Sequence, residues 1–117
     1  MGIRRVVPDL ITDRIEDSRA FYTELLGFDM GMDMGWIVTL VSPDNPTAQL
    51  SLSPWSENMP ITPGITVEVS DVDTIHEAVV RAGHEVVYPI TDEAWGVRRF
   101  FVVDPGGVVV NVMSHRL

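Results

Sequence analysis

Two carboxylates in predicted β-strands, Asp9 and Glu68, are the side chains of this sequence best suited to chemistry. If both reach one cavity, they could hold a cation, accept a hydrogen bond from an amine, or act as an acid–base pair when burial raises one pKa. The alternative is that each carboxylate pairs with an arginine or faces water, as most carboxylates in proteins do.

Three indoles offer a different kind of chemistry. Trp36, Trp55 and Trp95 stand at the heads of predicted strands or in a connector, places from which an aromatic ring can wall a pocket. Trp95, directly before Gly96, is best placed to stack on a planar or cationic ligand, and plain core packing is the alternative.

Arg98 and Arg99 are consecutive in a predicted strand and therefore point to opposite faces of the sheet. One of them is expected to face the ligand site, where it could bind an anion or pair with Glu68. The histidines match no set of metal ligands and are predicted to lie at the surface: His76, His84 and His115.

Composition limits the classes of partner and of chemical site that this chain can have. The net charge is −9, from 8 basic and 17 acidic residues, so the chain should repel nucleic acid and anionic lipid, and a cationic partner is favoured. The absence of cysteine excludes a disulfide framework, a thiolate metal site and a cysteine nucleophile. No apolar run approaches the ~20 residues that span a bilayer, so we expect a cytoplasmic protein without membrane contact.

Strands must position these side chains. Val97 to Val103 and Val108 to Met113 are rich in Val and Phe and flank the turn Asp104-Pro105-Gly106-Gly107, which predicts a hairpin. An earlier stretch repeats this pattern, with Trp36 to Val41 and Gln49 to Ser53 around a second Pro-containing turn. The first strand, Ile3 to Thr12, contains Pro8 and is expected at an edge of the sheet or with an irregular start.

Two amphipathic helices complete the pattern. Asp13 is predicted to cap the first, Gly27 to end it, and Phe21 and Tyr22 to lie in the core. Its apolar or small stripe is Ile15, Ser18, Phe21, Tyr22 and Leu25. Ser70 or Asp71 caps the second helix, Gly83 ends it, and its stripe is Val72, Ile75, Ala78, Val79 and Ala82.

The second half of the chain repeats the first. Adding 57 to each stripe position of the first helix gives a stripe position of the second, so that Ile15 matches Val72 and Leu25 matches Ala82. We therefore expect one domain, 1–117, made of two βαβββ modules: residues 1–55 and 64–117, joined by a connector over 56–63.

The paired modules, the run AFYTELLGF on the first helix, and Trp95-Gly96 ahead of the DPGG turn resemble the vicinal oxygen chelate superfamily. That superfamily joins glyoxalase I, extradiol dioxygenases and bleomycin resistance proteins. The resemblance implies an α+β fold in which two tandem βαβββ modules form a curled mixed sheet with a central cleft, and each helix packs on the convex face of its own module.

Metal-dependent members of the superfamily carry His or Glu ligands on the first and last strands of each module. The matching positions here are Val7, Ser51, Gly64 and Asn111. A serine and an amide offer at most two weak neutral oxygens to a divalent ion. We therefore expect neither a metal at these positions nor a cofactor.

Side chains alternate across each strand, so Leu50, Leu52, Val69 and Val112 should pack under the helices while polar residues face the other way. In the fold that the resemblance implies, that second face lines the cleft. The residues expected to bind a ligand there are Asp9, Trp36, Gln49, Ser51, Glu68, Trp95, Arg99, Phe101 and Asn111.

The resemblance and the acidic charge favour a homodimer of the bleomycin resistance type, which sequesters a cationic or aromatic antibiotic or metabolite. One alternative is a metal-dependent lyase or dioxygenase with displaced ligands such as Asp9, Glu68 or His115. Another is a metal-free lyase or isomerase that uses Asp9 or Glu68 as its base.

Overall fold

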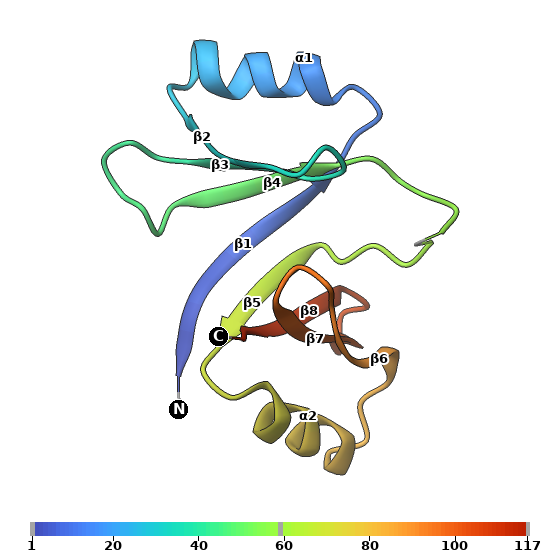
Figure 1. Cartoon of the computed structure of the whole chain (residues 1–117). Helices are drawn as coiled ribbons and strands as arrows, with labels where there is room; N and C mark the ends of the chain where they lie inside the picture. Colours follow the sequence, from blue (N-terminus) through green and yellow to red (C-terminus); the bar gives the residue numbers. More distant parts are fainter. Residues whose placement is uncertain (1, 59, 117) are drawn as a thin grey trace. The chain divides into compact units, whose positions relative to one another are not determined.

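The computed structural model describes residues 2–58 and 60–116. Its strands form one mixed sheet in the order β2-β3-β4-β1-β5-β8-β7-β6 (Figure 1). The predicted α+β fold with two βαβββ modules is confirmed. The elements are β1 (Ile3–Ile11), α1 (Ile15–Ala20), the π-helical turn η1 (Phe21–Leu25), β2 (Asp29–Asp33), β3 (Val38–Val41), β4 (Gln49–Ser53), β5 (Ile65–Val69), α2 (Val72–Arg81), β6 (Val86–Asp92), β7 (Val97–Val103) and β8 (Val109–His115).

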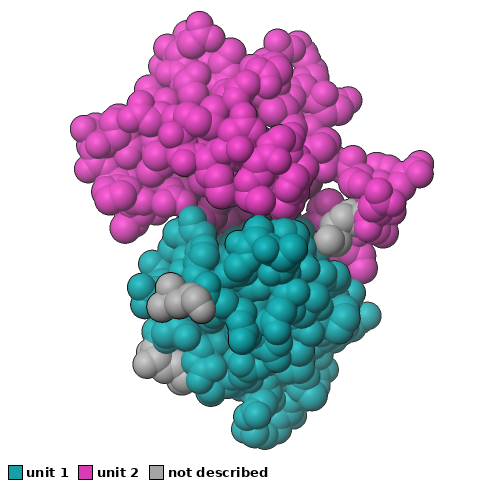
Figure 2. Space-filling view, viewed as in Figure 1, with its two compact units in different colours: residues 1–6, 63–117 teal, residues 7–62 magenta. Residues whose placement is uncertain are grey.

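The chain divides into two compact units (Figure 2). Unit 1 comprises residues 1–6 and 63–117, and unit 2 comprises residues 7–62. Strand β1 therefore contributes its first part to unit 1 and its second part to unit 2. The module bounds 1–55, 56–63 and 64–117, and the central cleft, stay predictions.

Strand β1 is central in the sheet order, between β4 and β5, so the predicted edge position is wrong. Pro8 is tolerated because the parallel pairing of β1 with β4 starts only at Asp9, which lies opposite Ser51. The missing backbone donor of proline thus falls just before this ladder rather than within it.

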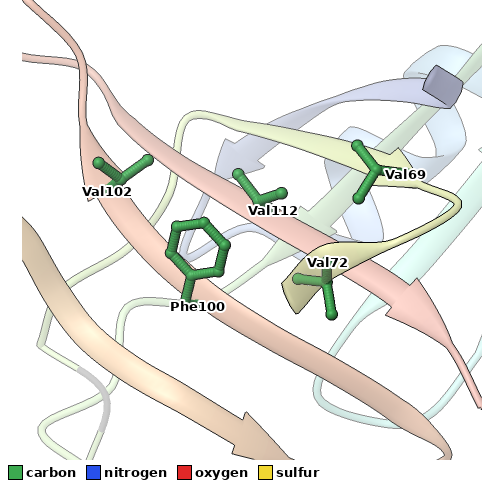
Figure 3. Close-up of a cluster of buried hydrophobic side chains, with 5 residues drawn as sticks. All are labelled: Val69, Val72, Phe100, Val102 and Val112. Atoms are coloured by element: carbon green, nitrogen blue, oxygen red, sulfur yellow. The ribbon is translucent and has the colours of Figure 1, made fainter. Parts of the chain in front are cut away.

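The core of unit 1 is a cluster of buried side chains on one face of its sheet and at the start of α2 (Figure 3). Phe100, with no exposed surface, is its largest member, and burial of such a side chain contributes about 1.5–3 kcal/mol. The buried cluster is Val69, Val72, Phe100, Val102 and Val112.

Helix α2 begins as predicted. Asp71 is the N-cap: its side chain accepts hydrogen bonds from the backbone N–H of Thr74 at 3.3 Å and from the Thr74 hydroxyl at 2.7 Å. These hydrogen bonds hold the pKa of the Asp71 carboxyl below its ordinary value. Gly83 follows the helix with a φ of 85°, in the left-handed region that favours glycine.

The predicted stripe of α2 is confirmed at Val72, Ile75 and Val79, which pack in or against the core of unit 1. It is wrong at Ala78 and Ala82, which are exposed. Ala82 is the C-cap residue, beyond the last turn that the sheet covers.

The core of unit 2 is formed in the same way between its sheet and α1. Its buried cluster is Val38, Leu40, Leu50 and Leu52, against which Leu10, Ile15, Tyr22 and Phe28 pack. The predicted alternation is therefore confirmed in both units: Leu50 and Leu52 in β4, like Val69 and Val112 in unit 1, face the helix of their own unit.

The first helix differs from the prediction. Its N-cap is Arg14, not Asp13, and no side chain caps it. Regular α-helix stops at Ala20, and the wider π-helical turn η1 rotates the following residues away from the α-helical stripe. Phe21 and Leu25 are consequently 49% and 73% exposed, so the prediction that they are core residues is wrong.

Candidate ligand-binding site

Two rows of side chains cross the sheet of unit 1 on the face opposite α2, which we call the α2-free face. Strand register sets the first row, and side chains alternate so that neighbouring rows on this face are two residues apart. The first row is Tyr88, Phe101, Asn111 and Thr66. The second row is Thr91, Arg99, Met113 and Glu68.

Asn111 lies at the middle of the first row and is 7% exposed. Its Nδ2 donates a hydrogen bond to Thr66 Oγ1 at 3.1 Å. Its Oδ1 is fully buried and has no hydrogen-bond partner among the described residues. Burying an unpaired acceptor costs about 1–3 kcal/mol, so this oxygen marks a position where a donor from outside the chain would be stabilising.

Arg99 lies beside Asn111 on the α2-free face, inside a cage of aromatic rings. Its guanidinium carbon is 5.1 Å from the ring centroid of Trp95, 5.3 Å from that of Tyr88 and 4.9 Å from that of Phe101. Arg99 Nε donates to Glu93 Oε2 at 2.6 Å, and the Tyr88 hydroxyl donates to the same oxygen at 2.9 Å. Cation–π attraction and an ion pair together hold this side chain in place.

Trp95 forms the exposed wall of this cage. Trp95 is 40% exposed, whereas Phe101, another wall of the cage, is 1% exposed. An indole with one face against a guanidinium and part of its surface in solvent can stack on a planar molecule.

Glu68 lies in the second row and is 9% exposed. It pairs with Arg5 Nε at 2.8 Å and with His115 Nδ1 at 2.9 Å, and Arg4 Nε lies 3.8 Å away. Burial by itself would raise the pKa of Glu68, but the hydrogen bonds and charges of His115 and Arg5 outweigh it, and the pKa lies below its ordinary value. Glu68 therefore pairs with an arginine, Arg5, which is one of the alternatives stated for it from the sequence.

The two consecutive arginines face opposite ways, as predicted. Arg99 is on the α2-free face, while Arg98 pairs on the other side with Asp73 of α2 at 3.0 Å and with Asp92 at 3.2 Å. Only Arg99 is therefore placed to meet a ligand on the α2-free face.

The remaining predicted residues lie in unit 2. Ser51 Oγ donates to Asp9 Oδ1 at 2.6 Å, and Gln49 Nε2 donates to the backbone oxygen of Pro46 at 2.8 Å. Trp36, 45% exposed, lies in the turn between β2 and β3. The structure thus brings Glu68, Trp95, Arg99, Phe101 and Asn111 together in unit 1, and it joins Asp9 to Ser51 in unit 2.

Tyr88 and Glu93 complete the cage, and sequence reasoning missed both. Strand β6, which carries Tyr88, has irregular register with β7 on both sides of this residue, so alternation gives no reliable face for it. Glu93 follows β6 in the turn before Trp95. Its position two residues ahead of the indole is the one local signal that could have drawn attention to it.

The donor set at the matching positions does not fit a divalent metal. Val7 is a buried aliphatic residue, the Ser51 hydroxyl donates to Asp9, and Asn111 donates to Thr66. Across residues 2–58 and 60–116, no three His, Asp or Glu side chains lie close enough together to hold a metal ion. The pair Glu68 and His115 lacks a third ligand of this type.

A hollow of about 300 Å³ lies in unit 2, and none of the residues predicted to bind a ligand lines it. Its lining is Thr12, Arg14, Asp17, Ser18, Phe21 and Tyr22. Arg14 and Asp17 form an exposed ion pair at 2.7 Å, so the charged groups of this hollow already satisfy each other.

Comparison with known families identifies the superfamily of this chain. The sequence profile of the Glyoxalase/Bleomycin resistance protein/Dioxygenase superfamily matches residues 2–112. The chain belongs to this superfamily. The predicted resemblance to vicinal oxygen chelate proteins is thereby confirmed. No curated protein matches the chain significantly.

Solved structures share the fold of this superfamily member. The NAD-dependent benzaldehyde dehydrogenase from Legionella pneumophila aligns over 95% of this chain and 99% of its own, with 20% identity and a TM-score of 0.75. A glyoxalase/bleomycin resistance protein/dioxygenase superfamily member from Vibrio splendidus 12B01 covers 97% and 99%, with 20% identity and a TM-score of 0.71. The methylmalonyl-CoA epimerase from Mycobacterium tuberculosis covers 99% and 89%, with 18% identity and a TM-score of 0.68.

These identities establish a common fold and leave the activity to be argued from the site. Among the described residues, no helix has the length and apolar character needed to cross a membrane.

Proposed function

We propose that this protein binds a small organic molecule on the α2-free face of unit 1 and sequesters it without a metal, in the manner of a bleomycin resistance protein. The bound part would be planar and aromatic, as in many antibiotics and secondary metabolites. The proposal includes a homodimer, as the sequence predicts.

The observation that carries this proposal is the unpartnered Oδ1 of Asn111, buried beside Phe101. A ligand N–H or O–H that donates to this oxygen would remove the cost of burying it unpaired. Trp95 stands partly exposed in the same unit, where a planar molecule could stack on it. An apolar surface with a few convergent polar groups is the usual composition of a small-molecule site.

The contacts of the site favour an aromatic ligand over a cationic one. A cationic ligand agrees with the net charge of −9, but Glu68 already has Arg5 and His115 as partners. The guanidinium of Arg99 already lies against the Trp95 ring, and its positive charge would repel a second cation there. Stacking and hydrogen bonding are therefore the interactions that remain for a ligand.

The enzymatic alternatives draw less support. A metal-dependent lyase or dioxygenase would need a third ligand beside Glu68 and His115, and none of the described His, Asp or Glu residues supplies one. A general base works best with a pKa near the working pH, whereas the partners of Glu68 lower its pKa. Metal analysis of protein purified without chelator tests the first alternative.

A thermal-shift screen of planar aromatic metabolites and antibiotics tests the proposal. A ligand that binds only the folded protein raises the Tm by mass action, and a concentration of 100 times Kd adds about 2.7 kcal/mol. Asn111→Leu, which keeps the volume and removes the acceptor, should weaken a hit by about tenfold or more, which is about 1.4 kcal/mol. The exposed His84→Gln is the matched control and should leave the Kd unchanged.

Hits that bind Asn111→Leu and the wild type equally would contradict the proposal. A screen of such molecules that yields no hit at all would contradict it as well.

A further inference from the structure

We infer that the ligand of the α2-free face carries a carboxylate or a similar planar oxyanion, which binds the terminal Nη1 and Nη2 atoms of Arg99. This inference rests on the proposed function and specifies the chemical class of its ligand. The predicted role of Arg99 as an anion-binding residue thereby acquires a defined pair of donor atoms.

The hydrogen bonds of Arg99 are incomplete. A guanidinium has five N–H donors, and among the described residues only Nε of Arg99 has an acceptor, Glu93 Oε2 at 2.6 Å. The side chain is 10% exposed. Both terminal nitrogens keep some contact with solvent, since Asn111 Oδ1 is the one fully enclosed side-chain polar atom without a partner in the described part of the chain. The two terminal nitrogens, which carry the other four N–H donors of this nearly buried cation, are therefore available to an acceptor that enters the site.

The surroundings of Arg99 hold those donors in a fixed direction. Tyr88, Trp95 and Phe101 contact the guanidinium through their rings, and Glu93 fixes the Nε side. Glu93 is itself held by the Tyr88 hydroxyl at 2.9 Å. A guanidinium whose orientation is fixed loses less entropy when it binds, and its two terminal nitrogens match the spacing of carboxylate oxygens.

Local charge permits an anion here despite the net charge of −9. Charges farther away than about 8 Å are largely screened at physiological salt, so the groups on the face itself decide the local field. Glu93 is neutralised by Arg99, and Glu68 has Arg5 at 2.8 Å and Arg4 at 3.8 Å. Each of the two glutamates is therefore paired with an arginine, so neither leaves an uncompensated negative charge that would repel an anionic group.

Asn111 Oδ1 and the Nη atoms of Arg99 would bind different groups of the same ligand. Asn111 and Arg99 lie in adjacent rows of the same face, with Phe101 next to Asn111 on the neighbouring strand. The acceptor Oδ1 of Asn111 requires a ligand donor, and the Nη atoms of Arg99 require a ligand acceptor. An aromatic acid that also bears a hydroxyl or amino group satisfies both requirements.

Three isosteric probes test the inference: benzoate, benzamide and benzamidine, which carry an anionic, a neutral and a cationic group on the same ring. Titration of the 117-residue protein, followed by amide chemical shifts, gives the three Kd values. We expect benzoate to bind at least tenfold more tightly than benzamide, and benzamidine to bind most weakly. Higher salt should weaken benzoate binding and leave benzamide binding nearly unchanged.

The variants separate Arg99 from the charge of the protein as a whole. Arg99→Gln should weaken benzoate binding by about tenfold or more, and Arg98→Gln, which removes the same charge on the other face of β7, should not weaken it. Because Arg99→Gln leaves Glu93 without its cation, the double variant Arg99→Gln/Glu93→Gln provides a second background without a buried unpaired charge. It should show the same loss.

The inference is overturned if benzamidine or benzamide binds as tightly as benzoate, if none of the three probes binds, or if benzoate binding is unchanged in both Arg99 variants. These results are distinguishable from a failure of the proposed function. An aromatic hit whose binding depends on Asn111 but not on Arg99 would support the proposed function and contradict only the inference that the ligand is an acid. A screen without any hit that depends on Asn111 would contradict both the proposed function and this inference.

Discussion

The two units place different polar pairs at equivalent points of their sheets. In unit 2, Asp9 lies opposite Ser51, and in unit 1, Thr66 lies opposite Asn111, at offsets of 66 − 9 = 57 and 111 − 51 = 60 residues. Ser51 donates its hydroxyl proton to Asp9 at 2.6 Å, whereas Asn111 donates to Thr66 and keeps a buried oxygen unpaired. Identical topology thus yields a satisfied pair in one unit and an available acceptor in the other.

The next strand reinforces the difference. Thr39 lies opposite Ser51 in unit 2, while Phe101 lies opposite Asn111 in unit 1 and packs on Tyr88 with ring centroids 4.7 Å apart. Duplicated strands keep their register because the pattern of apolar residues fixes it, but the side chains of the opposite face are free to diverge. The aromatic character of unit 1 on this face therefore supports the proposed ligand site over an equivalent site in unit 2.

The largest effect that we expect is a difference in stability between variants of the Asp9–Ser51 pair and of the Thr66–Asn111 pair. Ser51→Ala should lower the free energy of unfolding by about 1–3 kcal/mol, because it removes a hydrogen bond to a partly buried carboxylate. Asn111→Leu should cost less than about 1 kcal/mol or stabilise the fold, because it replaces an unpaired buried acceptor by an apolar group of similar volume. Urea titrations of both variants and the wild type measure the two values.

A larger loss for Asn111→Leu than for Ser51→Ala would break the comparison. It would mean that Asn111 Oδ1 has a structural partner within the protein, and the proposed site would lose its main support.

A smaller effect on the free energy of unfolding, confined to a pH range, is expected when Glu68 of unit 1 is replaced. The folded pKa of Glu68 is depressed, so its stabilising contribution is present above the ordinary value near 4.5 and is lost as pH falls through the folded pKa. Glu68→Gln should therefore lower the free energy of unfolding by about 1 kcal/mol at pH 6, and this difference should shrink below pH 4.5. Urea titrations at pH 6 and at pH 3.5 provide the comparison.

The exposed Glu24→Gln of unit 2 is the matched control, and it should show no such pH dependence. A Glu68→Gln loss that stays constant over this range would indicate that packing, and not the ion pairs with Arg5 and His115, explains the effect.

The sequence was sufficient for the parts of this fold that depend on periodicity. Alternation of apolar residues placed Leu52 and Val112 on the helix side of the sheet and Asn111 on the other, because a half-buried strand has a period of two. It could not place Tyr88, since register irregularities in β6 break that period. It could not decide between Arg98 and Arg99, because their orientation depends on partners far away in sequence, Asp73 and Glu93.

The helices of the two units offer the last and smallest comparison, since α2 has a side-chain cap and α1 has none. Both sequences place an aspartate ahead of the helix, yet only Asp71 accepts a hydrogen bond from the third residue that follows it. In unit 2, the Thr12 hydroxyl accepts instead from the Arg14 backbone N–H at 3.0 Å, which leaves Asp13 without that role.

Asp71→Ala should therefore lower the Tm measurably, because a backbone donor of the first turn loses its acceptor, whereas Asp13→Ala should leave the Tm unchanged. Thermal unfolding of both variants followed by circular dichroism provides the measurement, and Thr12→Val tests whether the hydroxyl is the cap substitute. Equal Tm losses for the two aspartate variants would show that α1 is capped by Asp13 in solution, and the contrast between the two helix starts would then disappear.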